Sequence, residues 1–210
     1  MLHTLRCVNP TREHPAPPEG VLRGMFEARK AVFVDLLKWD VPVLAGRYEV
    51  DQFDDIHATY LVVTDAHARH LASARLLPTT RAHILDSFYS ELCDEPPPRQ
   101  ADVLEVTRFC LDRRLRAAER RTARDALVHH LVAFALAHDI VALSAIAELT
   151  WFQQILAFGW RCRPLGLPRN LDGQFLAAMR IEIEQDTPAR LIAAGLSEAG
   201  VDAPAHRAAA

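Results

Sequence analysis

The order of apolar and polar residues in the first half of the chain predicts a helix followed by a β-hairpin. Within 21–38, apolar side chains recur three and four positions apart, which is the spacing of one helical face. Two short apolar runs, Ala58–Thr64 and His70–Leu77, are typical of paired strands. The acidic stretch 40–57, between the helix and the hairpin, is expected to be a loop.

The second half predicts a long helix between two strands, and then shorter elements. The strands are expected over Asp102–Leu111 and Ile140–Ala147, and the helix over Arg116–His138. A helix ending at a glycine, two strands and a last helix should follow, over Leu149–Phe158, Trp160–Leu165, Gln174–Glu184 and Pro188–Leu196. This order predicts an α/β fold, with a mixed, twisted sheet flanked by helices.

Length and composition fit a single domain over 1–210. Half of the 210 residues are hydrophobic and the formal net charge is −3, so the chain is too apolar and too weakly charged for disorder. It has no run of 18 apolar residues and no apolar core of a secretory signal, so we expect a cytoplasmic protein without a membrane span. Residues 1–20 are expected to be a mobile lead-in, Pro-rich over 9–19, and 197–210 a frayed tail.

Cysteines and histidines show no metal-binding pattern. Cys7, Cys93, Cys110 and Cys162 are widely spaced, so we expect reduced thiols that pack as small apolar residues. The histidines lack cysteines or carboxylates at ligand spacing, so no metal site is expected. The weak net charge and the absence of a nucleic-acid-binding signature argue against a nucleic-acid partner.

One candidate site begins on the first predicted helix. Arg29 and Phe33 are four positions apart and share a helical face, and Trp39 follows the helix. Phe33 and Trp39 could be core residues, with Arg29 a surface charge. Alternatively, the aromatic rings could hold a cation while Arg29 holds a carboxylate.

The predicted loop after this helix concentrates carboxylates. Glu49, Asp51, Asp54 and Asp55 lie within seven residues. Such a run is most often a solvated turn. A calcium loop is a second reading, although the glycine and terminal glutamate of an EF-hand are missing. An anionic site for an amine or another cation is the third.

Charged residues also stand within predicted strands. Arg75 lies in an apolar strand, so it needs a partner if it is buried. Glu105 and Arg108 are three apart in the next strand and therefore point to opposite faces of a regular strand. If they act together, the strand must carry a β-bulge, and we predict one there.

The start of the long predicted helix is rich in arginine. Six arginines lie between Arg113 and Arg124. They could be a solvated helix start, or a docking patch for phosphates or an acidic carrier protein.

Taken together, these segments resemble the acyl-homoserine-lactone synthases, the autoinducer synthases of bacterial quorum sensing. The strings Glu-Val-Asp-Gln-Phe-Asp-Asp, Ala-Arg-Leu-Leu-Pro-Thr and Glu-Val-Thr-Arg-Phe look like motifs of that family, in the same order and spacing over 22–110. The matching residues are Arg29, Phe33, Trp39, Asp51, Asp54, Arg75, Phe88, Glu105 and Arg108. Thr107 stands where the family usually has serine.

The resemblance implies a fold like that of GCN5-type N-acetyltransferases. It also implies a reaction between S-adenosylmethionine and an acyl thioester on acyl carrier protein or coenzyme A. The amine attacks the thioester, and the methionine carboxylate then closes a lactone and releases methylthioadenosine. S-adenosylmethionine is thus a substrate, and no separate cofactor is expected.

Each site residue acquires an expected role from this reaction. Glu105 is the expected base for the amine, with Glu49 second, and Arg108 belongs to the catalytic set. Phe33 and Trp39 face the sulfonium. Asp51 and Asp54 hold the arginines, and Arg29, Arg75, Phe88 and Thr107 complete the expected substrate site.

The resemblance also places the acyl pocket along Ile140–Ala147 and the helix after it. Ala145 falls where some family members carry a threonine linked to 3-oxo chains, and alanine cannot donate a hydrogen bond to that group. We therefore expect an acyl donor without it. Trp151 and Phe152 either shorten the pocket or pack in the core. The acyl chain, its carrier and the oligomeric state stay open.

Two alternative functions remain. One is a GCN5-like acyl-CoA N-acyltransferase with another amine substrate, but the segment Arg120–Arg124 lacks the glycine-rich turn expected for coenzyme A. The other is a non-catalytic S-adenosylmethionine-binding module.

Overall fold

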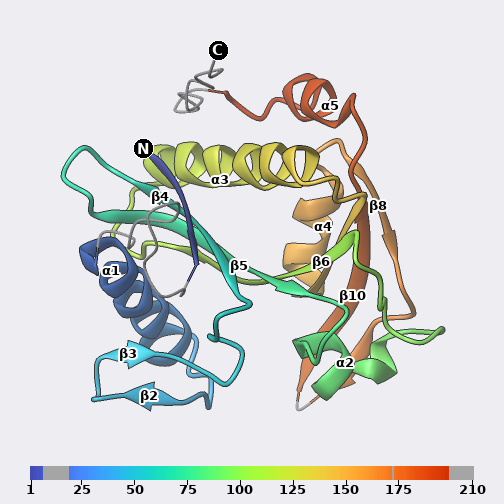
Figure 1. Cartoon of the computed structure of the whole chain (residues 1–210), viewed down its shortest axis with the longest axis horizontal. Coiled ribbons are helices and arrows are strands. Elements are labelled where there is room, and N and C mark those ends of the chain that lie inside the picture. Colours follow the sequence, from blue (N-terminus) through green and yellow to red (C-terminus); the bar gives the residue numbers. More distant parts are fainter. Residues whose placement is uncertain (7–18, 172, 199–210) are drawn as a thin grey trace.

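The computed structural model describes residues 1–6, 19–171 and 173–198, and it shows a twisted mixed sheet with helices on both faces (Figure 1). The main sheet has the order β1-β4-β5-β6-β7-β10-β8, with β9 paired to β10. Its strands are β1 (Leu2–Arg6), β4 (Thr59–Thr64), β5 (His70–Pro78), β6 (Val103–Leu111), β7 (Ala142–Glu148), β8 (Arg161–Pro164), β9 (Arg169–Leu171) and β10 (Gln174–Glu182). Only the β6–β7 pair is parallel among these strands, so the predicted mixed α/β sheet is confirmed.

One face of the sheet carries the main apolar core. The helices α3 (Ala117–Ala137) and α4 (Leu149–Leu156) pack on this face, and α5 (Thr187–Ala193) packs against α3 (Figure 1). Side chains from α3, such as Leu127 and Leu131, join residues of every central strand in one buried cluster. This face therefore anchors the sheet.

The opposite face carries the remaining elements. They are α1 (Glu19–Arg29), the π-helix η1 (Lys30–Leu36), the hairpin of β2 (Val43–Leu44) and β3 (Tyr48–Glu49), α2 (Ile84–Phe88) and the 3₁₀-helix η2 (Ser90–Leu92). In Figure 1 the helix α1, the β2–β3 hairpin and α2 all lie on the side of the sheet away from α3.

The first predicted helix is present but changes type at Lys30. The N–H group of Leu37 bonds to the carbonyl oxygen of Val32 at 2.9 Å, five residues back, which is the π-helical pattern. The N–H group of Trp39 bonds to the carbonyl oxygen of Phe33 at 2.8 Å. This wider turn brings the rings of Phe33 and Trp39 together. π-Turns of this kind often mark functional sites.

Three sequence expectations need correction. Residues 2–6 are not a lead-in but the edge strand β1, paired antiparallel with β4. The expected loop 40–57 contains the β2–β3 hairpin. The segments α2, η2 and β9 were not expected. The Pro-rich stretch from 9 to 18, Cys7 and the tail from 199 onward lie outside the described residues.

The described cysteines Cys93, Cys110 and Cys162 are free thiols. No helix within the described part of the chain is long and apolar enough to cross a membrane.

Candidate active site

Three arginines and three carboxylates form one buried network beneath α1 and the β2–β3 hairpin. The arginines are Arg29 at the end of α1, Arg75 in β5 and Arg108 in β6, and the carboxylates are Glu49, Asp51 and Asp54. The six formal charges cancel. Because a buried charge is costly without a partner, this balance makes the cluster tolerable inside the protein.

Arg29 is held from two sides. Its guanidinium donates to both carboxylate oxygens of Asp54 at 2.8 Å, and its Nε donates to Glu49 at 2.5 Å. The side chain of Arg29 is 1% exposed and that of Asp54 is 0% exposed. Arg29 is therefore not the surface charge that remained as an alternative.

Arg75 links the acidic loop to the sheet. It donates to both oxygens of Asp51, at 2.6 and 3.1 Å, and its Nε donates to the Thr107 hydroxyl at 2.9 Å. It also forms an ion pair with Asp54 at 2.9 Å. The expectation that a buried Arg75 needs a partner is confirmed, and so is the expected hold of Asp51 and Asp54 on the arginines.

Arg108 stands on the predicted β-bulge. Residues 107 and 110 of β6 pair with Arg75 and Ser73, so two residues of β6 oppose one of β5. The backbone of Arg108 has φ of 52°, the left-handed region. The bulge is confirmed, and it turns the guanidinium toward Glu49 at 3.0 Å and Asp51 at 2.7 Å.

The aromatic pair lies beside Arg108. The rings of Phe33 and Trp39 are stacked, with centroids 4.6 Å apart and planes 16° apart. The Arg108 guanidinium carbon is 5.7 Å from each ring centroid. Phe33 is buried, whereas Trp39 is only partly buried, so of the two rings Trp39 is the accessible one.

Electrostatics favour the ionised forms of Asp54 and Arg29. Burial alone raises the pKa of the Asp54 carboxyl, but hydrogen bonds and charge from Arg29 and Arg75 outweigh it and hold that pKa well below its ordinary value. Burial likewise lowers the pKa of Arg29, and its carboxylate partners more than reverse that effect. The cluster is thus a fixed scaffold of charges.

Glu105 lies apart from the ion pairs. It is fully buried, and its two oxygens accept hydrogen bonds from the N–H groups of Ile84 and Leu85 at 2.8 and 2.7 Å. Burial raises its pKa to about 7, although the two N–H groups and Arg75 partly oppose that shift. Glu105 therefore binds the first two N–H groups of α2, and burial brings its pKa close to neutral pH.

Sequence similarity to known proteins identifies the family of this chain. A family model described as autoinducer synthase matches residues 18–191. An acyl-homoserine-lactone synthase of Ralstonia nicotianae is 31% identical over 190 residues, which cover 86% of this chain and 91% of that protein. The chain belongs to the autoinducer synthase family. Its activity is therefore acyl transfer in the synthesis of acyl-homoserine lactones, the quorum-sensing signals.

Solved structures agree with this family. The CoA-dependent acyl-homoserine lactone synthase BjaI, in a structure with S-adenosylmethionine and isopentyl-CoA, is 26% identical with a TM-score of 0.81 over 93% of this chain and 90% of that one. An N-acetyltransferase fold from Lactobacillus plantarum is 16% identical with a TM-score of 0.57, over 88% of this chain and 98% of that one. The expected likeness to N-acetyltransferases in fold is thus confirmed.

Of the other residues singled out in the sequence, Phe88 reaches the cluster through Phe53, whereas Ala145 and Trp151 belong to the apolar core on the α3 side of the sheet. Phe88 at the end of α2 is exposed, and its ring meets Phe53 edge-on at 5.9 Å. Ala145 in β7 is buried, next to Val106 of β6. Trp151 in α4 lies 5.7 Å from Phe109, which follows the bulge.

Sequence reasoning missed two parts of the site. Tyr60 donates its hydroxyl to Asp54 at 2.9 Å, but its place in an apolar strand gives no sign of this role. The N–H groups at the start of α2 hold Glu105, and a five-residue helix leaves no periodic pattern.

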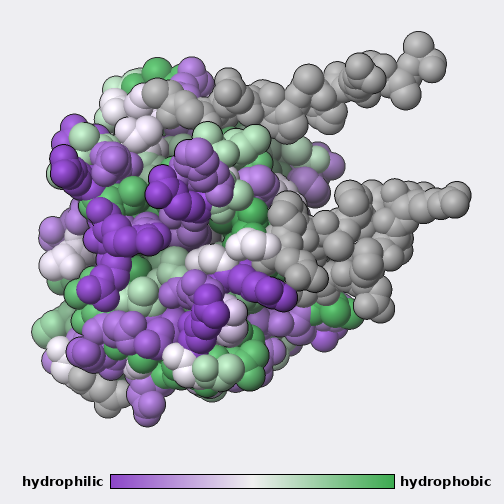
Figure 2. All heavy atoms as spheres, turned by 90° about the vertical axis from the view of Figure 1, so that its left-hand side faces the viewer, coloured by the Kyte–Doolittle hydropathy of each residue, from purple (hydrophilic) through white to green (hydrophobic). Residues whose placement is uncertain are grey.

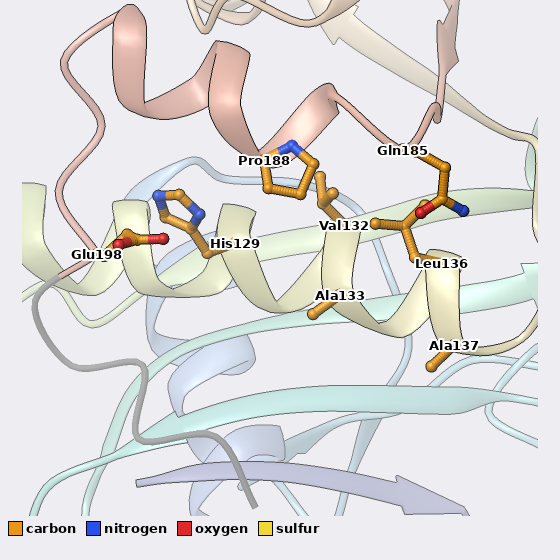
Figure 3. A pocket seen from close by; sticks show the side chains of 8 residues that line it. All are labelled: His129, Val132, Ala133, Leu136, Ala137, Gln185, Pro188 and Glu198. Carbon is orange, nitrogen blue, oxygen red and sulfur yellow. The ribbon is translucent and has the colours of Figure 1, made fainter.

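The surface of the synthase shows a hydrophilic face and, away from the cluster, a hollow. Seen from the end where α1 and the β2–β3 hairpin lie, the surface is largely hydrophilic with smaller apolar patches (Figure 2). A hollow of about 450 Å³ lies between α3 and α5, lined by residues such as His129, Leu136 and Pro188 (Figure 3). It is on the face of the sheet opposite Glu105, so we assign it no part in the reaction.

Proposed function

We propose that this synthase joins S-adenosylmethionine to an acyl thioester at the face of the sheet that carries Glu105 and the arginine–carboxylate network. The amine nitrogen attacks the thioester carbonyl, and the thiolate leaves with the electron pair of the C–S bond. The methionine carboxylate then attacks its own γ-carbon, and methylthioadenosine leaves as a neutral thioether. The relative BjaI, whose structure contains S-adenosylmethionine and isopentyl-CoA, supports this assignment.

The observation that carries the proposal is the place of Glu105, a fully buried carboxyl group held by two backbone N–H groups of α2. A base for this amine must accept a proton near neutral pH, and burial gives Glu105 a pKa of about 7. Glu49, the second candidate, has both oxygens engaged by Arg29 and Arg108. Each oxygen of Glu105 keeps one lone pair beyond its bond to α2. We therefore assign the proton to Glu105, directly or through water.

The network positions substrate rather than moving protons. We assign the outer face of Trp39 to the sulfonium, because Phe33 covers the other face. Arg108 lies beside the stacked pair, at the same 5.7 Å from both ring centroids, so it leaves the outer face of Trp39 to the sulfonium. Arg29 and Arg75 are saturated by carboxylates and fix the walls of the site.

Replacing Trp39 by alanine should weaken S-adenosylmethionine binding about 2- to 30-fold, the equivalent of a cation–π contact of roughly 0.5–2 kcal/mol. Calorimetry with each substrate measures this, and the affinity for the acyl donor should change less. Leu37→Ala, an exposed neighbour in the same turn, is the control. Equal loss for both substrates would refute the assignment of Trp39.

We propose an acyl donor without a 3-oxo group. The side chain of Ala145 offers no hydrogen bond, and the Phe109–Trp151 pair places bulky rings beside β6 and α4. We also propose that the acyl group is delivered in the cytoplasm, either by coenzyme A or by acyl carrier protein. An acidic carrier protein could bind the exposed arginines around the start of α3, which are Arg113, Arg114, Arg116, Arg120 and Arg121.

Mass spectrometry of organic extracts from cells that express the chain tests the proposed function. A lactone ion that disappears with Glu105→Gln would establish the reaction and identify the acyl chain. If none appears, purified protein is given a panel of acyl-CoAs with S-adenosylmethionine. Thiol release with a different amine would favour the N-acyltransferase alternative, and binding without turnover would favour the binding module.

A further inference from the structure

We propose that the Ser144 hydroxyl donates a hydrogen bond to the oxyanion that forms when the amine attacks the thioester. This inference rests on the proposed function. Ser144 lies in β7 and is 0% exposed. Its Oγ has no hydrogen-bond partner among the residues that the structure describes.

The register of the sheet places Ser144 beside Glu105. The strands β6 and β7 are parallel, and Glu105 is paired directly with Ser144. Paired residues of neighbouring strands point to the same face, about 5 Å apart. Ile146, two residues further along β7, packs against the same cluster as Leu85 of α2, which confirms that this is the face of Glu105.

The same place is where the two strands separate. Their pairing ends at Val106 and Ala145, although β6 continues to Leu111 and β7 to Glu148. Beyond that point the facing backbone edges of the two strands are not bonded to each other. An extended thioester can approach between them, and its carbonyl would then come within reach of Ser144 and Glu105 together.

An unpaired buried hydroxyl needs an explanation. Burying such a group without a partner is unfavourable, and folded proteins satisfy nearly all of them. Ser144 and Glu105 are neighbours and yet form no hydrogen bond, because the Glu105 carboxylate is directed to the N–H groups of α2. The hydroxyl therefore finds its partner in the bound substrates.

The oxyanion is the group that requires a donor at this point. As the N–C bond forms, the carbonyl π-electron pair moves to oxygen, and Ser144 stabilises that charge without giving up its proton. The intermediate then re-forms the carbonyl and expels the thiolate, while Glu105 holds the amine proton. A donor that acts only on the developing charge raises kcat without tightening substrate binding.

The test is Ser144→Ala, which removes one atom and leaves the packing unchanged. With acyl-CoA and S-adenosylmethionine, we expect kcat for thiol release to fall about 100-fold, with both KM values unchanged. The melting temperature should stay the same or rise, because the hydroxyl has no partner in the resting protein. The control is Ser73→Ala, a buried serine of β5 whose hydroxyl is bonded to His70. It should lower the melting temperature and leave kcat unchanged.

The kinetic constants of Ser144→Ala can overturn the inference in two ways. A kcat within twofold of wild type excludes Ser144 from the transition state. A higher KM for S-adenosylmethionine with kcat retained would mean that the hydroxyl binds the amine in the ground state. Wild-type protein that releases thiol while Ser144→Ala is unimpaired refutes this inference alone. Wild-type protein that releases none, either from the acyl-CoA panel or from acylated acyl carrier protein, refutes the proposed function as well.

Discussion

Glu105→Gln should lower turnover by about 10²- to 10⁴-fold, the usual contribution of a positioned general base. The amide cannot take the proton that the substrate ammonium group must lose before its nitrogen attacks. Its oxygen can still accept one of the two N–H groups of α2, so the fold should be kept. Steady-state thiol release and methylthioadenosine formation measure the effect, and circular dichroism with thermal unfolding checks the structure.

The pH dependence gives this expectation a second readout. Burial raises the pKa of Glu105 to about 7, so the carboxyl group is protonated below that pH. Because the reaction needs the ionised form, kcat/KM should fall as pH drops through about 7 in the free enzyme. Glu105→Gln should lose the limb set by this carboxyl group, and its low residual rate should instead follow the titration of the substrate amine, which has an ordinary pKa of about 8.

The matched control is Glu91→Gln in η2, an exposed glutamate close to α2 in the chain. It should keep both the rate and the acidic limb. Near-wild-type turnover of Glu105→Gln would remove Glu105 as the base. Because Glu49 is locked in ion pairs, the proton would then have to go to water or to the leaving thiolate.

The long periodic elements of the fold could be predicted from the sequence. The strands β4, β5, β6 and β7 and the helix α3 have apolar patterns several residues long, and all lie where those patterns place them. The strand β1 escaped prediction because its five residues mix apolar and polar types at a sheet edge. Two-residue strands such as β2 and β3 depend on tertiary contacts and leave no periodicity.

The site was partly predictable for a different reason. A buried arginine in an apolar strand needs a carboxylate, and the acidic loop offers several, so the pairing of Arg75 with Asp51 follows from charge alone. The β-bulge at Arg108 was predicted from the strand periodicity together with the premise that Glu105 and Arg108 act at one site, and it is present. Which arginine pairs with which carboxylate could not be predicted. Arg29, Glu49 and Arg108 lie on three separate elements, and only the folded chain brings them together.

Asp54→Asn should destabilise the protein by about 3–5 kcal/mol, the usual cost of removing one partner from a buried ion pair. Asp54 accepts from Arg29, Tyr60 and the N–H group of Asp51, and it also pairs with Arg75. The neutral amide removes one of the three carboxylate charges of the network, so the buried guanidinium groups of Arg29 and Arg75 lose a shared anionic partner. Urea unfolding at pH 7 measures the loss.

The control for this variant is its sequence neighbour. Asp55 is exposed, and its side chain accepts a bond from the N–H group of His57 at 2.8 Å that an amide oxygen can also accept, so Asp55→Asn should change stability by less than about 0.5 kcal/mol. If Asp54→Asn were as mild as this control, the network would be a solvated cluster rather than a buried scaffold.

Acid provides the same test without a mutation. The pKa of Asp54 is held below its ordinary value in the folded protein, so its ion pairs contribute stability that is fully present above about pH 4. That contribution should be lost as pH falls below 4 toward the lowered pKa. Wild-type protein should therefore lose stability steeply in acid, and Asp54→Asn should show a shallower dependence, because it has already lost the carboxylate that acid would protonate. Parallel slopes for the two proteins would mean that another carboxylate carries the acid sensitivity, and the arginines would then depend on Glu49 and Asp51 instead.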